Sequence, residues 1–225
     1  MTHGGGDGTR RMFELVHALP DQLLASAGLE GLDGIEPLAA DVRRIILCGM
    51  GGSAIAGDLV QPLLQDQAVS LTVWRDYGLP HWAGPGDLVL CSSYSGDTEE
   101  TLSGCREAAR RGCAGLAVTS GGRLAAIARQ DGFPAVILPA GLPPRASLGL
   151  GLGALTRVLG RLHLVPAASE AVAAAAADLL AVRDQRLAPV VLGGGEDTAP
   201  GPDPEGNPAV AELAAKLVDK VPVIY

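Results

Sequence analysis

Short apolar runs alternate with stretches of helical spacing through the middle of the chain. Five runs rich in Ile, Val and Leu are candidate strands: Ile45–Cys48, Ser70–Trp74, Asp87–Ser92, Gly115–Val118 and Ala135–Leu138. The intervening stretches predict helices at about 53–65, 98–111 and 122–130. Apolar strands separated by helices are typical of a parallel sheet covered on both faces. We therefore expect an α/β fold, a three-layer, doubly wound parallel sheet.

Helical spacing also flanks the predicted sheet. Apolar positions share one side over about 12–27, despite Pro20. Two further helices rich in Ala and Leu are expected at Ser147–Arg161 and Glu170–Leu187. The predicted sheet and these helices make one domain, residues 12–192, after a Gly-rich, disordered tail at 1–11.

A linker is expected at 193–208, where Gly, Pro and acidic residues should keep the chain extended. Asn207 and Pro208 then provide an N-cap and a first-turn proline for a helix over about 208–219. The sequence ends in the apolar run Val221–Tyr225. We expect residues 209–225 to begin a second, incomplete α/β unit; the alternative is that this run adds to the first sheet or to a partner subunit.

The composition narrows the class of protein. Hydrophobic residues make up 48% of the 225 residues and aromatic residues only 3%, so the core must be aliphatic. A net charge of −8 argues against a nucleic-acid surface, and no apolar run reaches the roughly 20 residues of a membrane helix. The four cysteines form no CxxC pair, and the N-terminus lacks a signal-peptide pattern. We expect a cytoplasmic, soluble protein with buried, reduced cysteines.

A run of hydroxyl residues, Ser92–Thr101, follows the third predicted strand and leads into a helix. The free amides and dipole of a helix N-terminus favour an anion, and Ser and Thr hydroxyls donate to phosphate oxygens. The candidate donors to a phosphate are the hydroxyls of Ser92, Ser93, Ser95 and Thr98. A capping box, Asp97-x-x-Glu100, is the alternative, although it accounts for only one of these polar residues.

A second strand–turn–helix, Gly49-Met50-Gly51-Gly52-Ser53-Ala54, follows the first predicted strand. Its glycines let backbone amides approach a ligand closely. A tight turn without a ligand, or a dinucleotide turn, would also fit. The dinucleotide fingerprint lacks its third glycine, at Ala54, and Asp76 is a poor ribose contact. Two such turns in one sheet suggest a phosphorylated sugar.

Arg145 stands in a proline-stiffened loop, Pro143-Pro144-Arg145, just before a predicted helix. An arginine in such a loop can be a fixed clamp for an anion, or simply a solvated surface residue. The four histidines are isolated and show no metal-ligand spacing, so no metal site is expected.

Three motifs together resemble the bifunctional phosphoglucose/phosphomannose isomerases of the SIS (sugar isomerase) superfamily. They are Gly49–Asp58, Ser93–Thr101 and Pro144–Gly149. The segment Asn207–Tyr225 is also similar to the part that leads into that family's second SIS domain. The resemblance implies that the first domain is an N-terminal SIS domain.

The resemblance implies an enzyme of carbohydrate metabolism that converts glucose 6-phosphate and mannose 6-phosphate to fructose 6-phosphate. The reaction passes through a cis-enediol and needs no cofactor or metal. By resemblance, Ser93, Ser95 and Thr98 hold the phosphate, and Arg145 stabilises the enediolate. The residues expected to contact the substrate on the other turn are Gly51, Gly52 and Ser53. The expected partners are a sugar phosphate and a second copy in a homodimer, with neither nucleic acid nor membrane.

The chain departs from the family pattern in two ways. Asp97 stands where the family usually has Asn, which is tolerable beside a phosphate if the side chain turns away to cap the helix. The family's general base and ring-opening histidine come from the second domain, so neither role falls on a residue here. We therefore expect poor isomerisation by this chain alone, since acid–base catalysis supplies about 10²–10⁴-fold. The alternatives are a non-catalytic sugar-phosphate sensor and a nucleotide-linked oxidoreductase.

Overall fold

The computed structural model describes residues 11–12 and 14–186, and its centre is one parallel sheet. The strand order is β2-β1-β3-β4-β5, and all neighbours are parallel. The strands are β1 (Arg44–Cys48), β2 (Ser70–Trp74), β3 (Asp87–Ser92), β4 (Ala114–Thr119) and β5 (Ala135–Ile137). The five predicted strands are confirmed, each to within one residue at either end.

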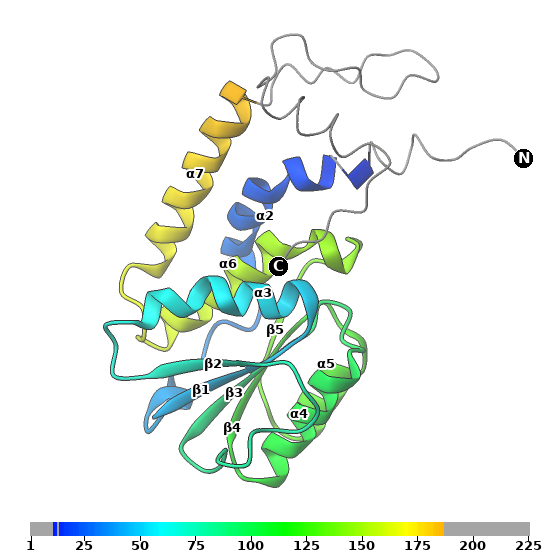
Figure 1. Cartoon of the computed structure of the whole chain (residues 1–225), viewed down its shortest axis with the longest axis vertical. Coiled ribbons are helices and arrows are strands. Elements are labelled where there is room, and N and C mark those ends of the chain that lie inside the picture. Colours follow the sequence, from blue (N-terminus) through cyan, green and yellow to red (C-terminus); the bar gives the residue numbers. More distant parts are fainter. Residues whose placement is uncertain (1–10, 13, 187–225) are drawn as a thin grey trace, which may run out of the picture.

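Helices cover both faces of the sheet (Figure 1). On one side lie α3 (Gly51–Val60) and α6 (Leu148–Arg161), with α2 (Leu19–Ala25) and α7 (Ala168–Arg186) packed outside them. On the other side lie α4 (Glu99–Arg110) and α5 (Gly122–Gln130). This arrangement confirms the doubly wound, three-layer α/β fold.

The alternation of side chains along each strand divides the core in two. On β1, Ile45 and Leu47 pack in the α3–α6 layer, whereas Ile46 and Cys48 pack in the α4–α5 layer. This is the two-residue period of a strand that is buried on both faces. Within the described residues all four cysteines are free and buried, as predicted, and burial raises the pKa of the Cys48 thiol to about 12.

Two prolines move helix boundaries away from their predicted places. The helix expected over 12–27 is interrupted by a turn at Ala18, and α2 starts at Leu19 with Pro20 in its first turn. Proline has no backbone N–H to donate, and its ring clashes with the preceding turn of a helix, so it is accepted only where a helix begins. The helix expected at 53–65 starts at Gly51 and gives way at Gln61 to a 3₁₀ turn that contains Pro62.

Several predicted segments lie outside the described residues: most of the tail at 1–11, the linker at 193–208, and the helix and strand expected over 208–225. Arg11, assigned to the tail, is helical. In the described part of the chain, no helix combines the length and apolar character needed to cross a membrane.

Alternating glycines in α6 allow α2 to approach it closely. A Cβ atom on Gly153 would lie 2.6 Å from the Cβ of Ser26, which no ordinary contact permits. A Cβ atom on Gly151 would lie 3.6 Å from the Cβ of Ala56, an ordinary van der Waals contact. The two glycines therefore differ in how much space surrounds them.

We expect Gly153→Ala to lower the free energy of unfolding by roughly 1–3 kcal/mol, as overpacking does. The matched variant Gly151→Ala should raise it by about 0.5–1 kcal/mol, because alanine is the better helix former. Urea unfolding followed by circular dichroism measures both. Equal effects of the two substitutions would contradict the close packing of α2 on α6.

Candidate functional site

The candidate site lies where the strand order reverses, between β1 and β3. Cys48 at the end of β1 pairs with Cys91 of β3, so the two strands end side by side. The helices that follow them, α3 and α4, cover opposite faces of the sheet (Figure 1). A crevice at such a point is the usual ligand site of an open α/β sheet. Both polar turns predicted from the sequence emerge here, and a Cβ on Gly49 would lie only 3.0 Å from the Ser92 carbonyl oxygen.

The three predicted phosphate ligands lie together at the end of β3. Ser93 Oγ is 2.9 Å from Thr98 Oγ1 and 3.5 Å from Ser95 Oγ. Ser93 is buried at the base of the group and Ser95 is exposed at its rim. The group stands at the N-terminus of α4, where the first amides of a helix have no intrahelical acceptor. Hydroxyls and amides thus form one cluster of hydrogen-bond donors.

The loop that carries these hydroxyls packs directly on the loop after β4. Gly96 has a φ of +73°, and a Cβ there would lie 2.0 Å from the Gly121 carbonyl oxygen. The Gly96 carbonyl accepts a hydrogen bond from Leu124 N at 2.8 Å. Only glycine satisfies both the left-handed backbone and this close approach. The hydroxyl cluster is therefore preorganised by the sheet and not by a ligand.

Asp97 does not cap α4. The N-cap residue of that helix is Thr98, and no side chain caps it. Asp97 Oδ1 instead accepts hydrogen bonds from Arg123 N at 3.2 Å and Arg123 Nε at 3.0 Å, in the first turn of α5. These bonds lower the pKa of Asp97. The interpretation of Asp97 as the cap of its own helix is wrong, but its carboxylate is engaged by the neighbouring helix.

The glycine turn and the Arg145 turn meet beside the end of β1. Gly51 has a φ of +49° and opens α3. A Cβ on Gly52 would lie 3.5 Å from the carbonyl oxygen of Pro144, which begins a 3₁₀ turn, Pro144–Ala146. Ser53, also predicted, is half-buried in the first turn of α3. Arg145 is exposed and makes no hydrogen bond or ion pair with any described residue, so its guanidinium is available to a ligand.

Tyr94 connects the hydroxyl loop to the Arg145 segment, a role that the sequence analysis missed. Its side chain is buried, with 6% of the residue's surface exposed. Its hydroxyl donates to the Pro139 carbonyl oxygen at 2.8 Å and accepts from Leu142 N at 3.0 Å. A buried tyrosine needs such partners for its hydroxyl. An aromatic residue between two serines at a strand end was the available signal.

Gln22 of α2 holds the other end of the same segment. Its Nε2 donates to the Ala146 carbonyl oxygen at 2.8 Å, and its Oε1 accepts from Gly149 N at 3.1 Å. The side chain therefore bonds both the Arg145 turn and the start of α6. Local sequence pattern contains no signal for this contact, because Gln22 and Ala146 are 124 positions apart.

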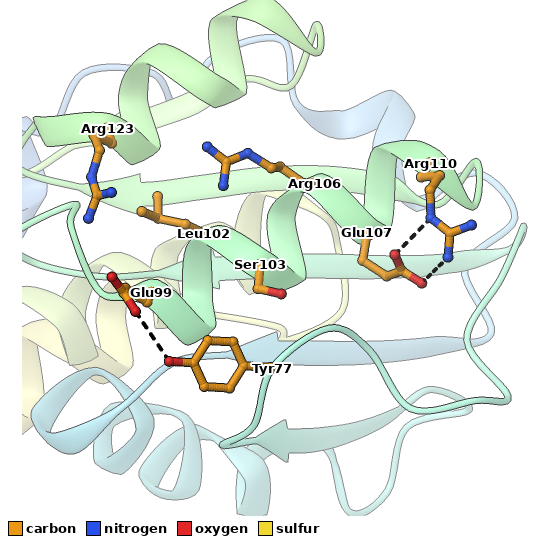
Figure 2. Close-up of a pocket in the computed structure, with 8 residues that line it drawn as sticks. All are labelled: Tyr77, Glu99, Leu102, Ser103, Arg106, Glu107, Arg110 and Arg123. Carbon is orange, nitrogen blue, oxygen red and sulfur yellow. Dashed lines mark hydrogen bonds and ion pairs between the residues drawn. The ribbon is translucent and has the colours of Figure 1, made fainter.

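A pocket of about 420 Å³ on the outer face of α4 contains none of the predicted site residues (Figure 2). Tyr77, Glu99, Leu102, Ser103, Arg106, Glu107, Arg110 and Arg123 line it. Its carboxylates already have partners: Glu99 accepts from the Tyr77 hydroxyl at 3.3 Å, and hydrogen bonds from Arg110 and Arg111 lower the pKa of Glu107 to about 2. We place the candidate site at the loops because three hydroxyls and the first amides of α4 lie together there, whereas the carboxylates of this pocket are engaged by Tyr77, Arg110 and Arg111.

The Asp97–Arg123 pair predicts a measurable titration. Because the folded state lowers the pKa of Asp97, the pair stabilises the fold above the unfolded pKa, and this stability is lost as pH falls through the folded pKa. NMR titration should find Asp97 titrating below its ordinary value, and Arg123→Ala should move it back up. Arg129→Ala, at the far end of α5, should leave the titration unchanged; a shift of the same size there would contradict the assignment.

Known proteins share sequence similarity with this chain. A bifunctional phosphoglucose/phosphomannose isomerase of Caldicellulosiruptor bescii is 34% identical over 215 residues, which is 95% of this chain and 60% of that protein. The chain thus spans less than two thirds of the length of this relative. No protein-family model matches the chain.

Solved structures with a similar fold include proteins that are named for phosphosugars. The tagatose-6-phosphate ketose/aldose isomerase of Escherichia coli superposes with a TM-score of 0.55 at 20% identity, over 77% of this chain and 54% of that one. The NanR protein of Vibrio vulnificus, solved with ManNAc-6P, superposes with a TM-score of 0.54 at 19% identity, over 78% of this chain and 72% of that one. The chain is a homologue of the bifunctional phosphoglucose/phosphomannose isomerases and has the α/β fold of the SIS phosphosugar isomerases.

Proposed function

We propose that this chain supplies the sugar-phosphate-binding half of an aldose–ketose isomerase that converts glucose 6-phosphate and mannose 6-phosphate to fructose 6-phosphate. The observation that carries the proposal is the convergence of the Ser93, Ser95 and Thr98 hydroxyls at the β1–β3 switch point. The names of the relatives support the substrate class, as does the ManNAc-6P complex of a structural neighbour.

In this proposal the phosphate sits over the N-terminus of α4. The three hydroxyls donate to its oxygens, and the helix dipole favours its charge. The turn Gly51–Ser53 lies at the neighbouring strand end, where backbone amides can reach the sugar hydroxyls without interference from side chains. The Asp97 carboxylate forms an ion pair with Arg123, so its negative charge is balanced beside the bound phosphate.

Arg145 is assigned to the charge that develops during the reaction. A base removes the proton from C2 of the open-chain aldose to give a cis-enediolate with its charge on O1. A proton passes from O2 to O1, and protonation at C1 then gives the ketose with its carbonyl at C2. Negative charge accumulates on the enediolate oxygen, which a fixed guanidinium stabilises more than it stabilises the substrate. We assign the base and the ring-opening group to no described residue.

Removing two hydroxyls of the cluster tests the phosphate site. Ser95→Ala combined with Thr98→Ala should weaken glucose 6-phosphate binding by a few kcal/mol, since each hydrogen bond to a charged group is worth roughly 1.5–3 kcal/mol. Isothermal titration calorimetry measures this loss. Ser169→Ala, at the start of α7, is the matched control and should bind normally. Unchanged affinity in the double variant would remove the loop from the site.

Arg145 is tested in a complete enzyme. We would join this chain to the part of the Caldicellulosiruptor bescii relative that it does not match, and measure isomerisation of both hexose phosphates with a coupled assay. Arg145→Ala should lower kcat far more than it raises KM, because its contact strengthens as charge develops.

The same assay, applied to the 225-residue chain alone, distinguishes half of an isomerase active site from a non-catalytic sugar-phosphate sensor. The proposal predicts binding with negligible turnover, restored by the joined part. Binding without turnover in the joined protein as well would indicate a non-catalytic sugar-phosphate sensor. Ordinary turnover by this chain alone would contradict the half-site assignment, and a base would then be sought among Glu99, Glu100 and His81.

A further inference from the structure

Tyr94 is tied to the structure at both its backbone and its side chain. Its carbonyl oxygen accepts hydrogen bonds from Ser120 N at 3.0 Å and Ser120 Oγ at 2.7 Å. Its hydroxyl, buried against the α6 side of the core, both donates to Pro139 and accepts from Leu142. A phenol hydroxyl has one proton to donate, and that donor is used here. Tyr94 thus joins three loops at the carboxyl edge of the sheet.

Only three residues separate this anchor from the next one. Leu142 N is held by Tyr94, and the Ala146 carbonyl oxygen is held by Gln22, whose residue is 7% exposed. Pro143 and Pro144 restrict the backbone between them. Arg145 is the exposed residue of this pinned turn, and it has no polar partner of its own among the described residues. The backbone position from which the Arg145 side chain extends is therefore set by contacts that Arg145 does not make itself.

We propose that Tyr94 and Gln22 are positioning residues that fix Arg145 relative to the hydroxyl cluster. Tyr94 suits this role because it is part of the loop that carries Ser93 and Ser95, so one residue links the two ends of the bound ligand. The inference rests on the proposed function, since it concerns the place of Arg145 in the same site. Displacement of a charged group by about 1 Å is enough to impair a reaction strongly.

Affinities for two ligands distinguish a positioning role of Tyr94 and Gln22 from a general effect on the stability of the fold. Inorganic phosphate engages only the hydroxyl cluster. 5-Phosphoarabinonate adds a carboxylate at the place of the enediolate charge, so its additional affinity reports on Arg145. Tyr94→Phe removes the hydroxyl and keeps the ring, and Gln22→Met removes the amide at similar volume.

Each variant should bind 5-phosphoarabinonate about tenfold more weakly, as expected when a bond to a charged group is impaired, and phosphate within about twofold. Combining Tyr94→Phe with Arg145→Ala should cost no more than Arg145→Ala alone, because the two changes remove the same contact. Tyr77→Phe, an exposed tyrosine bonded to Glu99, is the matched control and should change neither affinity.

Calorimetry, with thermal unfolding to verify that each variant folds, gives a decisive result. Three results would overturn the inference: equal losses of affinity for both ligands, no loss of affinity for either ligand, or losses that add to the loss caused by Arg145→Ala. If Tyr94→Phe does not fold, Gln22→Met and its combination with Arg145→Ala decide the question by the same criteria. Failure of the unsubstituted chain to bind 5-phosphoarabinonate more tightly than phosphate would instead refute the proposed function and, with it, this inference.

Discussion

The parallel pairing of β1 with β3 is the constraint on which the rest of the structure depends. The two strands are neighbours although β2 lies between them in the sequence, and their register sets Cys48 beside Cys91. Their helices leave toward opposite faces, so the ends of the two strands stay uncovered. A glycine turn and a hydroxyl turn that are more than forty positions apart in the sequence thereby lie side by side at one edge of the sheet.

Close backbone contact holds the two turns rigidly in place. A Cβ on Gly96 would lie 2.0 Å from the Gly121 carbonyl oxygen, which leaves no room for it, and a Cβ on Gly49 would be tight, at 3.0 Å from the Ser92 carbonyl oxygen. Buried polar groups extend this rigidity to the third component, since Tyr94 and Gln22 bond the backbone on either side of Arg145. Unpaired buried polar groups are costly, so these bonds define one arrangement of the three loops. The three loops of the candidate site are consequently held in place by contacts within the protein.

Local pattern was enough to predict the strands and the hydroxyl cluster. Ser70–Trp74 and Asp87–Ser92 match the structure because apolar runs bounded by loops are a short-range signal. The hydroxyls of Ser93, Ser95 and Thr98 share one turn, so their convergence needs only that turn to form. The helix ends near Pro20 and Pro62 were predicted at the wrong residues. The helical spacing of apolar residues continues past each proline, but the α-helical backbone is interrupted beside it.

Contacts between distant segments could not be predicted in this way. The strand order, the pairing of Asp97 with Arg123 and the bonds of Gln22 to Ala146 depend on how helices and strands pack. No propensity or spacing within α2 distinguishes Gln22 from a solvated glutamine. Sequence pattern therefore predicted which hydroxyls lie together, whereas it did not reveal the distant groups that hold the loops in place.

The central claim is that three separate turns form one sugar-phosphate site. An NMR titration of the amide signals with glucose 6-phosphate tests it most directly. The account predicts that signals of Gly51–Ser53, Ser93–Thr98 and Arg145 shift together and give a single dissociation constant. Shifts confined to one of these turns, or centred on the pocket around Arg106 on α4, would contradict it.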